Sequence, residues 1–361
     1  MRKVFFILFL SLPFFLLAQK SSDVSLSVSD SGGKKIDTNY VKFYKDKLII
    51  ALWWSERRFD ILLAPRIGSA VGDSINYIAN SNHVTGISVD YDIFSFAFGF
   101  RSISGGDART GNTDYLDLGF NINTKGLRFE NSFKKYTGFY DNNTKNYVQP
   151  FIADSTPYFQ NPSLNLQVIK SKLIYSFNKR KFALSAAYSN AKRQVKSSGS
   201  WLLIGNFYAM NFYSDSSFIP PLQQKYFGVI LDGLKRVNVY AYSAYGGYSH
   251  TFVAWKKLYF NMLAAFGLET QYRHFYTSPE NVHFKYWKTW FAADWRIALG
   301  YNGKRFFIRA SSIYDITNYG STDLIFDMKF IAGSLDVGYR FKFKAPKPYR
   351  KFQETNLYKR F

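Results

Sequence analysis

Charged residues recur at every second position along several stretches of this 361-residue chain. If one face of each stretch points into a cylinder, cations and anions on neighbouring strands could line a narrow aqueous pore with a preference for anions. The same charges could instead pair across strands and fill a small barrel. The sequence leaves both interpretations open. The candidate lumen charges are Arg128, Glu130, Lys134, Glu269, Arg273, Asp294, Arg296, Arg305, Arg309, Asp315 and Arg340.

Residues for catalysis or metal binding are sparse. His83, His250, His274 and His283 are too scattered for a metal cluster with recognisable spacing. Ser249 precedes His250, but adjacent residues on a strand point to opposite faces and cannot pair as nucleophile and base. We therefore expect no enzymatic activity, no metal and no cofactor. A lipid hydrolase, of the kind that carries a serine and a histidine on the outer wall of a barrel, is the least favoured alternative.

The carboxyl-terminal stretch shows which element would position the charges. From Ile331 to Phe343, apolar and polar side chains alternate without a break, as on a strand with one apolar and one polar face. The stretch also resembles the closing-strand signal of outer-membrane barrels, in which a polar residue is followed by glycine and then by two large apolar residues. Its insertion signal would consist of Asp336, Gly338, Phe341 and Phe343.

The same alternation recurs along the chain. Phe94, Phe96, Phe98 and Phe100 stand at strict two-residue spacing opposite small residues, which predicts hydrocarbon on one side of that strand. Further strands are expected over residues 47–64, 87–91, 116–122, 127–134, 164–177, 182–189, 258–272, 287–301 and 306–316. Tight turns join several of them as hairpins, and residues 141–162 and 214–235 are expected as long loops.

The amino-terminal residues predict export. A basic start, an apolar run from Val4 to Leu17 and Ala18 before Gln19 are typical of a secretory signal peptide. The rest of the chain has no apolar run of the length of a transmembrane helix. A membrane protein without such helices must cross as a closed barrel. The aromatic content of 20% agrees with the aromatic girdles of such barrels.

We therefore predict an all-β fold, a transmembrane antiparallel up-and-down β-barrel, in the outer membrane of a Gram-negative cell. The expected organisation is a signal peptide (1–18), a periplasmic lead-in (19–46), the barrel (47–344) and a basic periplasmic tail (345–361). The strand count is unresolved, because residues 182–189 and the stretch ending near Phe212 both run outward. Twelve strands are preferred, with fourteen as the alternative, and a separate plug domain is not expected.

The formal net charge of +22 is concentrated in short turns and in the tail. Export and the lack of a known binding motif argue against nucleic acid as a partner. The basic turns are 179–181, 256–257 and 304–305, and the tail adds Lys344, Lys347, Arg350, Lys351, Lys359 and Arg360. This basic rim could bind anionic lipid headgroups or an acidic partner, or it could be an ordinary solvated rim.

Several short motifs resemble those of a family of predicted outer-membrane barrels known as domain of unknown function 4421. They lie at residues 40–42 and 46–48, at 199–205 and at 214–220. The resemblance implies a barrel and its location, and it implies no activity and no catalytic residues.

The first functional hypothesis is a passive channel for small, possibly anionic solutes. The alternative is a closed structural or docking barrel that binds a partner through its basic rim or outer loops. The expected partners are outer-membrane lipids, the barrel-assembly machinery and a periplasmic protein.

Overall fold

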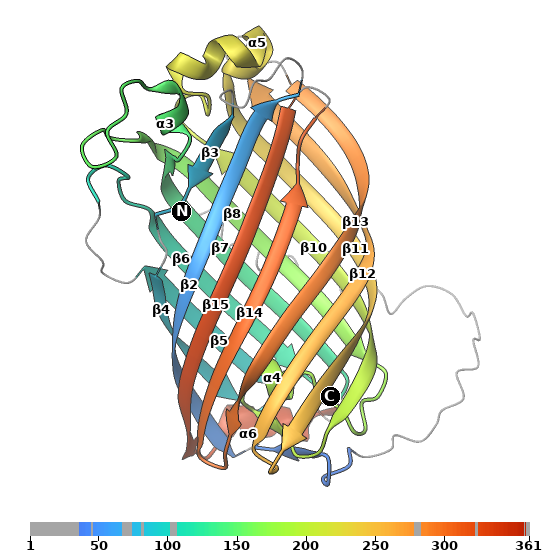
Figure 1. The fold of residues 1–361 in the computed structure, drawn as a ribbon. Coiled ribbons are helices and arrows are strands. Elements are labelled where there is room, and N and C mark those ends of the chain that lie inside the picture. Colours follow the sequence, from blue (N-terminus) through green and yellow to red (C-terminus); the bar gives the residue numbers. More distant parts are fainter. Residues whose placement is uncertain are drawn as a thin grey trace, which may run out of the picture. The chain divides into compact units, whose positions relative to one another are not determined.

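The computed structural model describes residues 36–44, 46–66, 74–80, 83–101, 107–277, 283–321, 324–356 and 358. One antiparallel sheet closes on itself to form the wall of a barrel (Figure 1). Its strands are β2 (Lys47–Pro65), β3 (Ile75–Ile78), β4 (His83–Tyr91), β5 (Phe94–Arg101), β6 (Asp114–Asn123), β7 (Leu127–Asp141), β8 (Phe159–Ser176), β10 (Ser198–Tyr213), β11 (Leu234–Ala254), β12 (Leu258–Thr277), β13 (His283–Asn302), β14 (Phe306–Asn318) and β15 (Leu324–Lys342). The predicted signal peptide lies outside the described residues.

The barrel closes where β15 pairs with β2, from Leu324 opposite Pro65 to Lys342 opposite Lys47. β3 and β4 lie one after the other along the opposite edge of β2. The closed ring therefore has twelve strands, and the preferred count is confirmed. β3 also pairs with β7, through Tyr77 and Ile78. At this end of the barrel β3 therefore links β2 to β7 without β4, β5 and β6 between them.

The outer face of the wall is apolar because alternate side chains of each strand point away from the lumen. Phe96, Phe98 and Phe100 on β5 are about half exposed, as are Phe266 on β12 and Leu299 on β13. Large exposed apolar side chains are a liability in water, but they match the hydrocarbon of a membrane. No helix in the part of the chain that the structure describes is long and apolar enough to cross a membrane.

The expected strand over residues 182–189 is wrong. These residues include α4 (Ser185–Tyr188) and are followed by β9 (Lys192–Gln194), which pairs with β1 (Val41–Phe43) in a separate two-stranded sheet. Phe182, Leu184 and Ala186 are buried. The apolar alternation arises because this segment packs inside the barrel, and β10 begins only at Ser198. The count of twelve was thus right although residues 182–189 form no strand of the wall.

The half of the lumen away from the short turns, which we call the outer half, contains an apolar core that the alternation of side chains did not predict. Buried side chains from strands all around the ring meet there, including Ile61 on β2, Phe212 on β10 and Phe326 on β15. Phe227 and Leu231 of α5 (Gln224–Asp232) join this core from above. The loops at this end also hold α3 (Thr144–Tyr147) and η1 (Pro221–Gln223). The interior is therefore charged over only part of its height.

The basic tail forms a helix, α6 (Lys347–Glu354), at the end of the barrel with the short turns (Figure 1). Its aromatic residues contact the wall, with the ring centroid of Tyr349 at 5.2 Å from that of Tyr91 and Phe352 at 6.4 Å from Phe94. The carboxylate of Asp92 in the β4–β5 turn accepts hydrogen bonds from Tyr349, Gln353 and Tyr358. The tail is thus a docked helix with its cations turned to solvent.

Candidate functional site: the interior of the barrel

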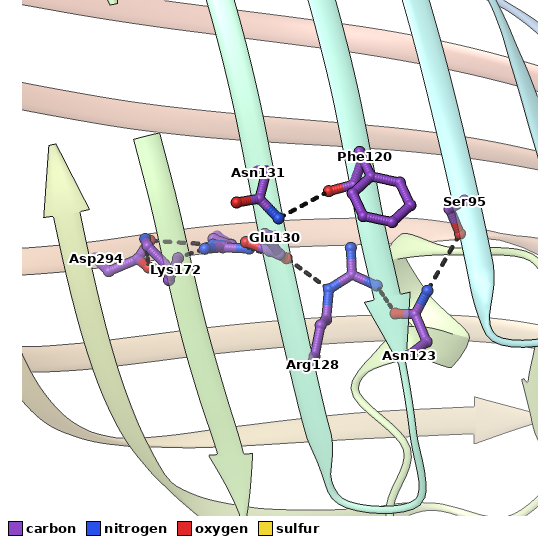
Figure 2. A network of polar contacts seen from close by, with 9 residues as sticks. Ser95, Phe120, Asn123, Arg128, Glu130, Asn131, Lys172 and Asp294 are labelled. Carbon is purple, nitrogen blue, oxygen red and sulfur yellow. Dashed lines mark hydrogen bonds and ion pairs between the residues drawn. The ribbon is translucent and has the colours of Figure 1, made fainter. Parts of the chain in front are cut away.

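A chain of ion pairs crosses the lumen (Figure 2). Glu130 on β7 binds Arg128 on the same strand and Arg296 on β13, whose Nη1 lies 3.0 Å from both carboxylate oxygens. Arg296 also binds Asp294 at 3.1 Å, and Asp294 accepts a bond from Lys172 on β8. All five side chains are largely buried. Since β13 is not adjacent to β7 or β8 in the sheet, the network links opposite walls.

A second group of charges lies on β2, β6, β14 and β15. Arg57 on β2 binds Asp117 on β6 at 2.8 Å, and Arg309 on β14 binds Asp336 on β15 at 2.7 Å. Trp53 lies flat against the wall beneath Arg57. A Cβ on Gly99 would come within 2.3 Å of the Trp53 ring, so a residue without a side chain is needed there.

Between these pairs lies a polar cavity of about 200 Å³. Arg57, Asp117, Arg309 and Asp336 line it, together with the buried carboxylate of Asp90 on β4. The volume is enough for several water molecules, since about 10–15 Å³ of such space holds one. The cavity is polar enough to hold water, and it does not by itself form a passage through the barrel.

Residues 182–195, which are almost all buried, fill the lumen below this cavity, and we call them the inserted segment. Its Phe182 and Leu184 pack in an apolar cluster with residues of β8, β10, β11 and β12. Lys192 donates to the Thr124 carbonyl oxygen, and Arg193 donates to the Asn302 carbonyl oxygen at 3.3 Å. The inserted segment therefore contacts several sides of the ring and closes the end that carries the short turns.

Arg340 on β15 anchors the inserted segment. Its Nε and Nη2 donate to the carbonyl oxygen of Asn190 at 3.1 and 3.0 Å, and its Nη1 donates to Gly303 at 2.9 Å. The guanidinium also lies over the ring of Tyr44 at 4.2 Å. One lumen arginine thus joins the wall, the β13–β14 turn, the inserted segment and the residues before β2.

The candidate charges not named so far have different environments. Lys134 lies over the ring of Phe330 at 4.4 Å, inside the outer half of the lumen. Glu269 accepts hydrogen bonds from Ser243 and Gln271, and the fully buried Arg273 donates to Gln271 and to Gly320.

Arg305 does not lie in the lumen wall. It is exposed in the turn between β13 and β14, because this residue lies beyond the end of the strand. Asp315 belongs to β14, but its side chain is outside what the structure describes.

The four residues of the insertion signal all belong to β15 or directly follow it. Asp336 and Gly338 face the lumen, where a Cβ on Gly338 would meet the Phe307 ring at 2.2 Å. Phe341 and Phe343 are exposed on the outer side, and Phe343 contacts Tyr91. The placement agrees with the expected faces, while the role in membrane insertion stays a prediction.

Interior charges missing from the candidate set include Lys172 and Arg57. Lys172 shares a strand face with the buried Ile174 and Leu166. A cation at an alternate position among apolar residues was the sequence signal that could have indicated an interior charge. Arg57 lies in β2, where adjacent polar residues obscure the alternation. Within the described ranges no group of three or more histidine and acidic side chains could hold a metal ion.

A family model described as "Domain of unknown function (DUF4421)" matches residues 35–341. The chain belongs to this family. No curated protein matches the DUF4421 chain. Among solved structures, it is similar to the outer membrane protease OmpT of Escherichia coli, with 6% identity, a TM-score of 0.40, and coverage of 83% of this chain and 98% of that one.

Two other solved structures are an outer membrane channel and a transporter. The COG4313 channel of Pseudomonas putida F1 has 11% identity and a TM-score of 0.34, covering 85% of this chain and 100% of that one. The toluene transporter TodX of P. putida has 9% identity and a TM-score of 0.24, covering 84% and 92%. Because the identities and TM-scores are this low, the activities of these proteins do not transfer to the DUF4421 chain.

Proposed function

We propose that the DUF4421 chain is a closed outer-membrane barrel that works as a docking protein and binds an acidic partner on its periplasmic surface. The observation that supports this proposal is the filling of the lumen by three features. An apolar core occupies the outer half, ion pairs cross the lumen, and the inserted segment fills the end with the short turns. A passive channel would require a continuous aqueous path, which this packing opposes.

The surface at the short-turn end supplies the binding chemistry. Short turns face the periplasm in barrels of this type. The exposed cations there include Lys179, Arg180, Lys181, Lys256, Lys257, Lys304, Arg305, Lys344, Lys347, Arg350 and Lys351. Cations concentrated on one surface raise the association rate of an acidic partner and make its binding sensitive to salt.

The proposal is tested by isolating the barrel from envelope extracts in mild detergent. We expect an acidic protein to co-purify at low salt and to be lost when Lys344, Lys347, Arg350 and Lys351 are replaced by glutamine. The matched control replaces Lys145 and Lys225, which are exposed at the opposite end. Retention of the partner by the first variant, or its loss in the control, would contradict docking at the periplasmic surface.

A second candidate function is a gated channel. The observation that favours it is the polar cavity above the inserted segment, together with the non-covalent contacts that hold this segment. In this case the inserted segment would have to leave the lumen and the apolar core would have to open.

A further inference from the structure

β13 is paired on both sides along only part of its length. Its pairing with β12 runs from Tyr301 to His283, whereas its pairing with β14 ends at Trp295 opposite Tyr314. β14 itself stays paired with β15 as far as Asn318. Among the described residues, those from 285 to 294 of β13 thus have no partner on the β14 side. The two strands diverge toward the outer end (Figure 1), and we call the space between residues 285–294 and 315–318 the β13–β14 slot.

The chain beyond β14 explains the divergence. Had the register continued, Ile316 would lie opposite Ala293. Instead the chain turns inward, and Tyr319 is buried with its ring stacked on that of Tyr208 at 6.0 Å. Arg273 donates a hydrogen bond to the carbonyl oxygen of Gly320. Contacts inside the lumen therefore hold the end of β14 away from β13.

The divergence leaves side chains of the lumen face accessible. Trp290 shares its face with the buried Asp294, yet it is 46% exposed. Ile313 shares its face with Arg309 and is 41% exposed, and it does not line the polar cavity. Trp290 and Ile313 belong to the face that points into the lumen, yet their side chains are exposed. We infer that the wall is open beside these two residues.

The slot combines a cation with aromatic surface. Lys288, on the same face as Trp290, places its Nζ 4.5 Å from the centre of the Trp290 ring. On the outer side of the same strand, Trp287 and Phe291 are the most exposed large apolar residues, at 69% and 67%.

An open strand edge is not stable against hydrocarbon, because its unpaired backbone groups must be satisfied by water, protein or a polar ligand. The apolar side chains around the slot place this edge beside the membrane. These requirements are met by a molecule with an apolar tail that contacts the aromatic residues and with polar atoms that hydrogen-bond to the strand edge. The positive charge of Lys288 favours a negative charge on that molecule.

We propose that the β13–β14 slot is a lateral binding site for an amphiphile with an anionic headgroup and an apolar chain. The headgroup binds Lys288, and the chain lies against Phe291, Trp295 and Tyr314, which are all exposed beside the slot. The molecule enters sideways from the membrane, so it needs no passage through the filled lumen. This site is separate from the docking surface and does not depend on it.

The test uses the barrel in nanodiscs of neutral phospholipid with a photoreactive fatty acid, compared with the fatty alcohol of the same chain. We expect cross-links of the acid to concentrate on residues 285–295 and 313–321, as mapped by mass spectrometry. Lys288→Gln should weaken labelling by the acid by roughly tenfold, since a charge-assisted hydrogen bond is lost, and should leave the alcohol unchanged. Lys288→Arg should restore labelling by the acid.

Two matched controls separate the slot from the rest of the wall. Lys285→Gln removes an exposed cation from the outer face of the same strand and should change nothing. Trp290→Ala should reduce labelling by both probes, whereas Trp201→Ala, which removes a 68% exposed ring on β10, should not. Labelling spread evenly around the barrel and insensitive to Lys288→Gln would mean annular lipid only and would overturn the proposal.

A second copy of the chain could also cover the open edge. The sequence contains no cysteine, so Thr289→Cys introduces a single thiol at the exposed edge of β13. Because the site is for a small amphiphile, we expect this variant to remain monomeric under mild oxidation. A disulfide-linked dimer formed in high yield would show strand pairing between two copies and would contradict the lateral site.

Discussion

Replacing Glu130 by alanine probes the ion network that crosses the lumen. Glu130 is the acid shared by Arg128 and Arg296, whose side chains are 7% and 8% exposed. Removing one partner of a buried pair leaves an uncompensated charge and typically costs about 3–5 kcal/mol. Arg296 keeps Asp294, and Arg128 keeps a hydrogen bond to Asn123. We therefore expect a loss near the lower end, about 3 kcal/mol.

The assay is reversible unfolding in urea of the barrel folded into liposomes, followed by tryptophan fluorescence. The matched control is Glu269→Ala, which removes a lumen glutamate that accepts hydrogen bonds from two neutral groups. Its removal leaves neutral donors unsatisfied rather than uncompensated cations, which costs about 1–3 kcal/mol. Equal losses for the two variants would refute the reasoning, because the charge network would then be no more important than neutral contacts.

Three further predictions concern the wall and the tail. Phe266→Arg, on the lipid face, should cost on the order of 2–4 kcal/mol in the same unfolding assay, and Ser311→Arg, on the lumen face, should cost less; equal losses would mean that the faces are misassigned. Gly99→Ala should lower the free energy of unfolding by about 1–3 kcal/mol because the new methyl group meets the Trp53 ring. An unchanged urea midpoint of unfolding would show that the ring moves aside. Burial and the Asp92 carboxylate raise the pKa of Tyr349, so docking of α6 should be complete below the ordinary tyrosine pKa of about 10 and lost as the pH rises through the raised value. The anisotropy of a fluorophore on α6 measures this docking, and a loss of anisotropy already at neutral pH would contradict it.

The alternation of side chains predicted much of the wall because it is a local property of each strand. The hairpin of β4 and β5, with its turn at Asp92, and the outward face of Phe96, Phe98 and Phe100 follow directly from it. The closure of the ring by β15 also agrees with the pattern around Asp336. In each case one face meets hydrocarbon and the other does not, so the period of two is unambiguous.

The interior could not be predicted in the same way. Apolar residues that face the lumen, such as Phe212 and Phe326, look in the sequence like residues that face lipid. The inserted segment alternates around Phe182 although it is not part of the wall. The pair formed by Lys172 and Asp294 joins residues 122 positions apart on opposite sides of the ring. Such contacts depend on the register of the whole barrel.

The measurement that tests the closed interior most directly is ion conductance in planar bilayers. The comparison is between the native chain and a variant in which residues 179–196 are replaced by a short Gly-Ser turn, which the pairing of Ser176 with Leu202 permits. A closed barrel predicts no steady current from either protein, because the apolar core and the ion pairs remain in the variant. A steady current from the native protein would contradict the account, and a current from the variant alone would favour the gated channel.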